Sequence, residues 1–160
     1  MPLLVRILKA KMPLMFPQKT NSFRVMIDHT KILARTKDFS KKMKANREHL
    51  GSVIRRVATM ANAKTRLVVF NFQGKTLQLS ARNPDLGGDS EESLPVEFQG
   101  EAVEVGINAA YLLEELRLAH SEEVRFKFNN PLGAVVVEPV AEKADYFFIV
   151  MPLRILKEPG

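Results

Sequence analysis

The stretch from Asn46 to Ala61 constrains the fold most, because its apolar residues recur at helical spacing. They lie at offsets of 0, 3, 4, 7 and 11 along one stripe of an α-helix: Leu50, Val53, Ile54, Val57 and Ala61. Asn46 is a favoured N-cap, because its side chain can accept hydrogen bonds from the first unpaired backbone N–H groups. Arg55 and Arg56 fall on the opposite side. The sequence therefore predicts an amphipathic helix with a basic outer face.

A second helix is predicted to start near Asn108, another residue suited to the N-cap position. Its apolar stripe is formed by Leu112, Leu113, Leu116 and Ala119. A hairpin that turns at Gln73 and Gly74 is predicted for residues 65–72 and 75–82. Residues 83–92 predict an acidic, turn-rich loop.

Further strands are expected from β-rich runs on either side of these elements: 22–27, 39–44, 93–100, 102–107, 123–130, 133–139 and 145–153. Four strands would then lie between the helices and three after them. Runs of strands interrupted by helices are typical of α+β folds with antiparallel sheets, and not of the βαβ alternation of a parallel sheet. The predicted fold class is therefore α+β.

The charge of the chain is unevenly distributed. Residues 1–80 hold 17 Lys or Arg against 3 Asp or Glu, a balance of +14, whereas residues 81–160 hold 7 against 15, a balance of −8. A basic half favours contact with a polyanion on one side of the molecule. A solvated basic surface that binds no ligand is the alternative interpretation.

Several classes of function find little support in the sequence. The chain has no cysteine, and His29, His49 and His120 lack the spacing of metal ligands. It contains no Gly-rich phosphate loop and no nucleophile elbow, so we expect no catalytic residues, metal or cofactor. No apolar run reaches the length of about 20 residues that a membrane span needs, and the basic amino end does not resemble a signal peptide. A cytoplasmic location fits this composition.

Domain organisation is expected to follow a boundary near residue 40. Residues 1–20 carry Pro2, Pro13 and Pro17 without a clear period, which indicates a tail or linker. We therefore expect residues 1–40 to form an N-terminal segment, and residues 41–160 to form one domain. A chain of 160 residues is long enough to bury a core without disulfides.

Three segments, in order and with fitting spacing, resemble the third, carboxy-terminal domain of the bacterial sliding clamp, the β subunit of DNA polymerase III. REHLGSVIRRVATMANAKTRLVVFNF is similar to the first helix of that domain, the turn and the next strand. GEAVEVGINAAYLLEELRLAHSEEVRFKF is similar to the glycine–apolar–asparagine entry into its second helix. DYFFIVMPLRI is similar to its carboxy-terminal ending. The resemblance covers Asn46 to Ile155, and residues 1–40 are at most a remnant of a preceding clamp domain.

The resemblance implies a DNA-clamp (processivity) fold, with two helices packed on antiparallel sheets and facing duplex DNA. A clamp holds DNA without reading its sequence, so cations on the helical side would attract phosphates. The candidate DNA-binding residues are Arg55, Arg56, Lys64 and Arg66, followed by Arg47 and Arg117. For each, a solvated surface charge is the alternative.

The resemblance also implies a docking site for short peptides of replication and repair proteins. The positions that match this site are Thr65, Asn108, Tyr111, Leu132, Ala134, Ile149, Val150, Met151, Pro152, Leu153, Arg154 and Ile155. Met151 and Leu153 offer adaptable apolar contact, and Arg154 offers a charge at the rim. Alternatively, Asn108 only caps a helix and Tyr111 only packs. Residues 147–150 are then plain core strand.

The implied partners are double-stranded DNA, the α subunit of DNA polymerase III, the clamp loader and other proteins that carry clamp-binding peptides. The clamp has three such domains in each chain and closes as a ring, so a homo-oligomer is expected if this domain is part of a full clamp. Part of the peptide pocket comes from a neighbouring domain, and LKEPG, residues 156–160, extends past the usual ending. The alternative functions are a stand-alone basic nucleic-acid-binding module and, third, a small enzyme.

Overall fold

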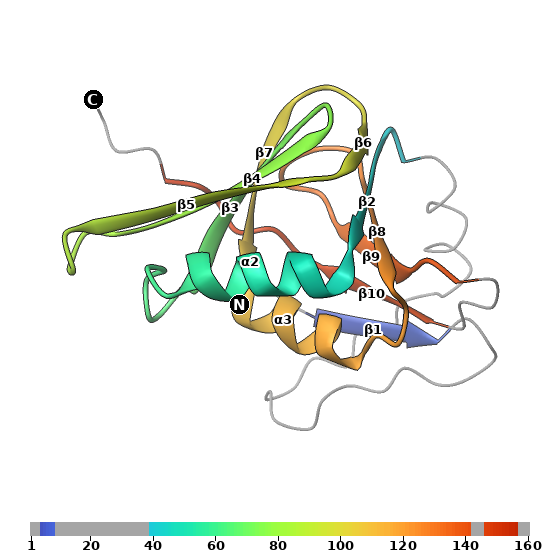
Figure 1. The fold of residues 1–160 in the computed structure, drawn as a ribbon, viewed down its shortest axis with the longest axis horizontal. Coiled ribbons are helices and arrows are strands. Elements are labelled where there is room, and N and C mark those ends of the chain that lie inside the picture. Colours follow the sequence, from blue (N-terminus) through green and yellow to red (C-terminus); the bar gives the residue numbers. More distant parts are fainter. Residues whose placement is uncertain (1–3, 9–38, 142–145, 157–160) are drawn as a thin grey trace.

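The computed structural model describes residues 4–8, 39–141 and 146–156. Within this part of the chain, two helices pack on two antiparallel sheets (Figure 1). The larger sheet orders its strands as β1 (Leu4–Leu8), β10 (Tyr146–Val150), β9 (Val135–Pro139), β8 (Glu123–Phe128), β2 (Lys41–Asn46) and β6 (Glu97–Gln99). The smaller sheet runs β5 (Gly88–Pro95), β4 (Thr76–Asn83), β3 (Leu67–Gln73) and β7 (Val103–Asn108). The predicted α+β class is confirmed.

Both predicted helix starts are confirmed by their caps. Helix α2 (Arg47–Ala58) follows Asn46, whose Oδ1 accepts the N–H of His49 at 2.9 Å. Helix α3 (Ala109–Leu118) follows Asn108, whose Oδ1 accepts the N–H of Ala110 at 3.0 Å. The apolar stripes are buried, with Leu113 alone among the predicted stripe residues partly exposed. In the part of the chain described, neither helix is long and apolar enough to cross a membrane.

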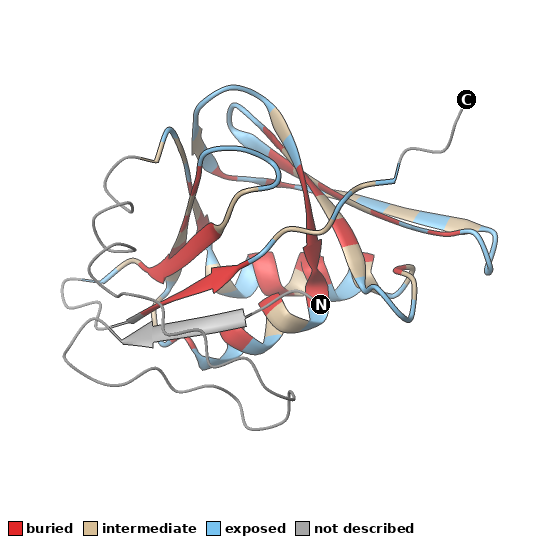
Figure 2. Ribbon diagram, turned by 180° about the vertical axis from the view of Figure 1, so that it is seen from behind, coloured by how far each residue is buried: buried red, intermediate tan, exposed pale blue. Residues whose placement is uncertain are grey.

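The core joins the two sheets through an aromatic cluster. Phe72 of β3 lies 5.0 Å from Phe128 of β8 and 5.4 Å from Phe98 of β6, measured between ring centroids. These rings therefore connect the smaller sheet with the larger one at one end of the molecule. Buried residues line the sides of the strands and helices that face one another (Figure 2). The stripes of α2 and α3 complete the same core.

The predicted loop over residues 83–92 is wrong in its second half. Strand β5 starts at Gly88 and pairs with β4 along its whole length. Its acidic side chains do not prevent this, because the ladder bonds come from the backbone and the side chains have partners. Gln78 Nε2 donates to Glu91 Oε1 at 2.6 Å, and Arg56 pairs with Glu92. Tertiary contacts thus override the low β propensity of this segment.

The chain changes sheets after Pro95, which divides the strand predicted at 93–100. The N–H of Val96 donates to the carbonyl of Lys75 at 2.9 Å, and β6 then pairs with β2 in the larger sheet. As a result, the described chain has five strands between α2 and α3 where four were predicted. The strand expected at 39–44 is confirmed as β2.

Strand β1 lies within residues 1–20, for which the sequence predicted a tail or linker. It pairs antiparallel with β10, with Val5 opposite Ile149. Sequence patterning did not predict this strand, because the flanking prolines and basic residues conceal it. The strand predicted at 22–27 lies outside the described residues. The division into residues 1–40 and 41–160 stays a prediction.

Arg47 links the start of α2 to the end of α3 through hydrogen bonds. Its Nε donates to the carbonyl of Ser121 at 2.7 Å, and its Nη1 donates to the carbonyl of Leu116 at 3.2 Å. The second contact satisfies a carbonyl in the last turn of α3, where a cation is favourable to the helix dipole. Arg47 therefore has a structural role, which weakens its case as a DNA-binding residue.

Replacing Arg47 with methionine should lower the free energy of unfolding by about 1–3 kcal/mol, because two charge-assisted hydrogen bonds to partly buried carbonyls are lost. Urea denaturation measures this difference. Arg117→Met is the matched control, since Arg117 is exposed on α3, and surface changes usually stay within about 0.5 kcal/mol. Equal destabilisation by the two substitutions would mean that the hydrogen bonds of Arg47 do not stabilise the fold.

Candidate functional site

The C-terminal segment, residues 151–155, passes from one sheet to the other. β10 ends at Val150, which pairs with Val135 in the larger sheet. The N–H of Leu153 then donates to the carbonyl of Gly106 in β7 at 2.8 Å, which forms an isolated antiparallel bridge to the smaller sheet. Pro152, between these points, has no N–H to donate. The segment therefore crosses between the sheets as irregular chain.

Side chains of this segment remain accessible. Met151 is 37% exposed and Arg154 is exposed, while Pro152, Leu153 and Ile155 are intermediate. An apolar segment that is held at its backbone but open at its side chains is suited to contact with an apolar partner. Leu156, the first residue beyond the matched ending, is 88% exposed.

Close to Leu153, the structure brings together two further parts of the chain, residues 65–67 and residues 106–108. Leu67 of β3 pairs with Asn108 of β7, and Gly106 lies two residues before Asn108. Thr65 precedes Leu67 by two residues, and its Oγ1 accepts the N–H of Leu67 at 3.4 Å. Thr65, in the turn before β3, and Asn108, at the end of β7, therefore lie next to the parts of the chain that adjoin the C-terminal segment.

Asn108 has a clear structural role at the start of α3. Asn108 is buried, and its Oδ1 accepts from the N–H groups of both Ala110 and Tyr111. Tyr111 is partly exposed in the first turn of the helix. The cap role of Asn108 is thus established, whereas a role for either residue in peptide contact stays a prediction.

The remaining predicted peptide residues differ in accessibility. Leu132 is 57% exposed in the loop before β9, and Ala134 directly precedes Val135, the partner of Val150. Ala134 therefore adjoins the point where the chain leaves β10. Ile149 and Val150 are buried, and Val150 belongs to the main core. Their side chains offer little surface to a peptide, so we expect them to support the site and not to line it.

A tight turn at residues 62–66 follows α2 and displays two of the predicted DNA-binding cations. Asn62 Oδ1 accepts the N–H groups of Lys64 at 2.9 Å and of Thr65 at 3.2 Å. Arg66 has a left-handed backbone, with φ of 51°, and its carbonyl accepts the N–H of Ala109 at 2.9 Å. These bonds fix the turn against the start of α3. Lys64 and Arg66 are both exposed.

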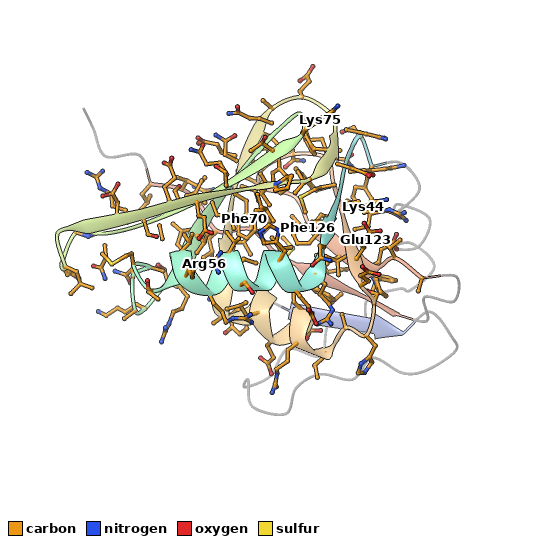
Figure 3. The ribbon with its side chains drawn as sticks, in the orientation of Figure 1. Lys44, Arg56, Phe70, Lys75, Glu123 and Phe126 are labelled. Atoms are coloured by element: carbon orange, nitrogen blue, oxygen red, sulfur yellow. The ribbon has the colours of Figure 1, made fainter. Side chains whose placement is uncertain are left out.

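Arg55 and Arg56 project from the outer side of α2, as predicted, but their surroundings differ. Arg55 is exposed, and its Nη2 donates to Ser52 Oγ at 3.2 Å. Arg56 Nε donates to Glu92 Oε2 of β5 at 2.9 Å (Figure 3). The hydrogen bond from Arg56 lowers the pKa of Glu92 below its ordinary value, and the same bond raises the pKa of Arg56. Glu92 therefore partly neutralises Arg56.

Two lysines on the larger sheet, Lys44 of β2 and Lys127 of β8, are also paired with acids. Lys44 Nζ lies 3.2 Å from Glu97 and 3.7 Å from Glu123, and the hydrogen bond to Glu97 is the main cause of its raised pKa. Lys127 Nζ lies 2.7 Å from Glu138. Lys44 lies at the opposite end of α2 from Arg56 in Figure 3. Lys44 and Lys127 are thus offset by acids, whereas Arg55, Lys64 and Arg66 at the end of α2 and in the adjoining turn are exposed.

Gly106 belonged to the matched glycine–apolar–asparagine entry into the second helix, but the sequence did not predict that it contacts the C-terminal segment. Leu67, which also contacts this segment, was not singled out. A glycine within the expected strand 102–107 was the available signal, because glycine inside a strand often marks a close approach of another backbone. In the described residues, no group of three His, Asp or Glu side chains could hold a metal ion.

The family model described as the C-terminal domain of the DNA polymerase III beta subunit matches residues 19–154. The chain is 34% identical to the beta sliding clamp of Proteus mirabilis over 128 residues, which are 80% of this chain and 34% of the relative. It is 29% identical to the beta sliding clamp of Escherichia coli K12, again over 80% of this chain and 34% of the relative. The chain thus spans about a third of the length of these relatives.

Solved structures give the same result. A DnaN sliding clamp from Pseudomonas aeruginosa bound to griselimycin superposes with a TM-score of 0.73 at 29% identity, over 81% of this chain and 34% of that one. Another crystal structure of the sliding clamp from the same organism has a TM-score of 0.72 at 30% identity, over 80% and 34%. The chain belongs to the family of C-terminal domains of the DNA polymerase III beta subunit.

Proposed function

We propose that this chain is a non-enzymatic sliding-clamp domain that docks clamp-binding peptides at its C-terminal segment and contacts duplex DNA without sequence preference. The observation that carries the proposal is the C-terminal segment itself. Its backbone is bonded to β7 through Leu153, while Met151 and Arg154 stay exposed. Family membership supplies the class of ligand that such a segment would take.

The chemistry of the segment suits peptides from several partners. Met151 is flexible and polarisable, which favours contact with apolar anchors of different shapes. Pro152 removes a donor and keeps the segment from becoming a regular strand. Arg154 is placed to bind acidic or carbonyl groups at the rim. The proposed partners are the α subunit of DNA polymerase III, the clamp loader and other proteins with clamp-binding motifs.

Contact with DNA is proposed for the end of α2 and the turn that follows it. Arg55, Lys64 and Arg66 are exposed there, and such cations attract phosphates independently of sequence and in a salt-dependent way. Arg56 contributes less in this proposal, because it must first leave Glu92. Arg117 is exposed on α3 and remains a secondary candidate.

A homo-oligomeric ring is proposed where this domain forms part of a full clamp. Because the chain spans about a third of its relatives, one copy cannot enclose a duplex by itself. The alternative of a stand-alone nucleic-acid-binding module is not favoured by the comparisons, since the relatives named above are sliding clamps. An isolated clamp domain should bind short linear duplexes weakly, whereas a dedicated module should bind them well.

Peptide docking is tested with a labelled peptide in which glutamine is followed by leucine and phenylalanine anchors. Fluorescence anisotropy should detect binding to the wild type, and Met151→Ala combined with Leu153→Ala should abolish it because the apolar contacts are lost. Leu86→Ala is the matched control, since Leu86 is an exposed leucine in the turn between β4 and β5. Equal binding by the wild type and the double variant would refute the docking site.

The proposed DNA surface is tested by removing the charge of Glu92, the acidic partner of Arg56. Glu92→Gln should raise affinity for a short duplex about two- to fivefold at low ionic strength. One further phosphate contact should also make the slope of log K against log salt concentration more negative by about 0.9. An electrophoretic gel shift across salt concentrations measures both quantities.

Glu91→Gln is the control for this change. It removes the same charge from β5, but the side chain of Glu91 contacts Gln78 and not Arg56. It should raise affinity less and leave the salt dependence unchanged. If the two variants behave alike, net charge alone explains the effect, and Arg56 is not a latent DNA contact.

A further inference from the structure

Gly106 lies where the C-terminal segment meets the smaller sheet, and there is no space for a side chain at this position. A Cβ atom on Gly106 would lie 2.7 Å from the carbonyl oxygen of Leu153 and 2.8 Å from Leu67 Cδ1. It would also lie 3.1 Å from Ile155 Cγ1. Real Cβ contacts are almost never shorter than 3.0 Å. Because the nearest of these atoms belongs to the backbone, a rotamer change cannot relieve the clash.

The backbone conformation of Gly106 does not explain the glycine. Gly74, Gly87 and Gly100 have positive φ values, whereas Gly106 does not. Within a strand, glycine loses more conformational entropy on folding than other residues and packs no side chain. Space for the incoming segment is therefore the physical reason for glycine at this position.

The space above Gly106 matters because this residue lies on the edge strand that the C-terminal segment contacts. β7 is a terminal strand of the described smaller sheet, paired with β3 on one side. On its other side, the carbonyl of Gly106 accepts the N–H of Leu153, and the carbonyl oxygen of Leu153 occupies the space that a Cβ atom on Gly106 would need. Leu67, which belongs to β3, completes the contact. The backbone of the C-terminal segment is thus held on β7, while the side chains of Met151 and Arg154 stay exposed.

We propose that Gly106 is a positioning residue of the peptide-docking site, which seats residues 151–155 on β7 by lacking a side chain. This inference rests on the proposed docking function. Any side chain at position 106 displaces the segment outward, and the surfaces of Met151 and Leu153 then no longer present one site. Gly106 acts through the segment and does not itself contact the peptide.

Gly106→Ala tests the proposal with two measurements on the full chain. Hydrogen exchange followed by NMR should show that the Leu153 amide loses protection, while the amide of Phe70 in β3 keeps it. Affinity for the labelled peptide with glutamine, leucine and phenylalanine should fall about tenfold or more, as expected when a supporting contact is lost. Gly51→Ala is the matched control, because its Cβ would meet only Arg55 Nη1, at 3.6 Å. It should leave both measurements unchanged.

The outcomes separate the inference from the function on which it rests. Unchanged Leu153 protection in Gly106→Ala, or unchanged peptide affinity despite lost protection, overturns the positioning role. If the wild type binds no peptide, the docking function fails, and the proposed role of Gly106 in docking fails with it, while the exchange of Leu153 still reports whether Gly106 seats the segment.

Loss of Phe70 protection in Gly106→Ala would mean that the variant does not fold. In that case Leu153→Pro is compared with Leu153→Ala, because only the first removes the N–H that bonds to Gly106. The proline variant should bind the peptide more weakly than the alanine variant. Equal affinities would overturn the proposal.

Discussion

The fold depends on the contact between two antiparallel sheets that share one core. Phe72 touches Phe128 and Phe98 across the boundary, and the stripes of α2 and α3 fill the space beside them. Because both sheets bury their inner faces in this core, the chain must pass from one sheet to the other. Two of the places where it does so are after Pro95, on the way from β5 to β6, and after Val150.

The second of these crossings gives the molecule its candidate site. A chain that leaves one sheet and bonds to the edge of another cannot satisfy the regular ladder of either, so its side chains are less completely covered. The single bridge from Leu153 to Gly106 fixes this segment without burying it. The same region adjoins the turn at residues 62–66, whose Arg66 carbonyl is bonded to Ala109 at the start of α3. The proposed peptide and DNA surfaces are thus built on neighbouring parts of one framework.

Helices and their caps could be predicted from the sequence, because Asn46 and Asn108 precede stripes of helical period. Strand β5 could not, since its acidic residues are stabilised by partners such as Arg56 that are distant in sequence. For the site, the resemblance led to Met151, Leu153 and the cations after α2. It included Gly106 in the entry into the second helix but did not predict its role, which depends on a contact 47 residues away along the chain. It also did not predict the neutralisation of Arg56. Those features require knowledge of which strands are neighbours.

The C-terminal segment, residues 151–155, is proposed as the surface on which a clamp-binding peptide docks. Amide chemical-shift mapping of the isotope-labelled chain during titration with such a peptide tests it most directly. If the peptide docks there, the largest shifts should occur at residues 65–67, 106–108, 134 and 151–155. Largest shifts along α2 or β5 instead, or no shifts at saturating peptide, would contradict it.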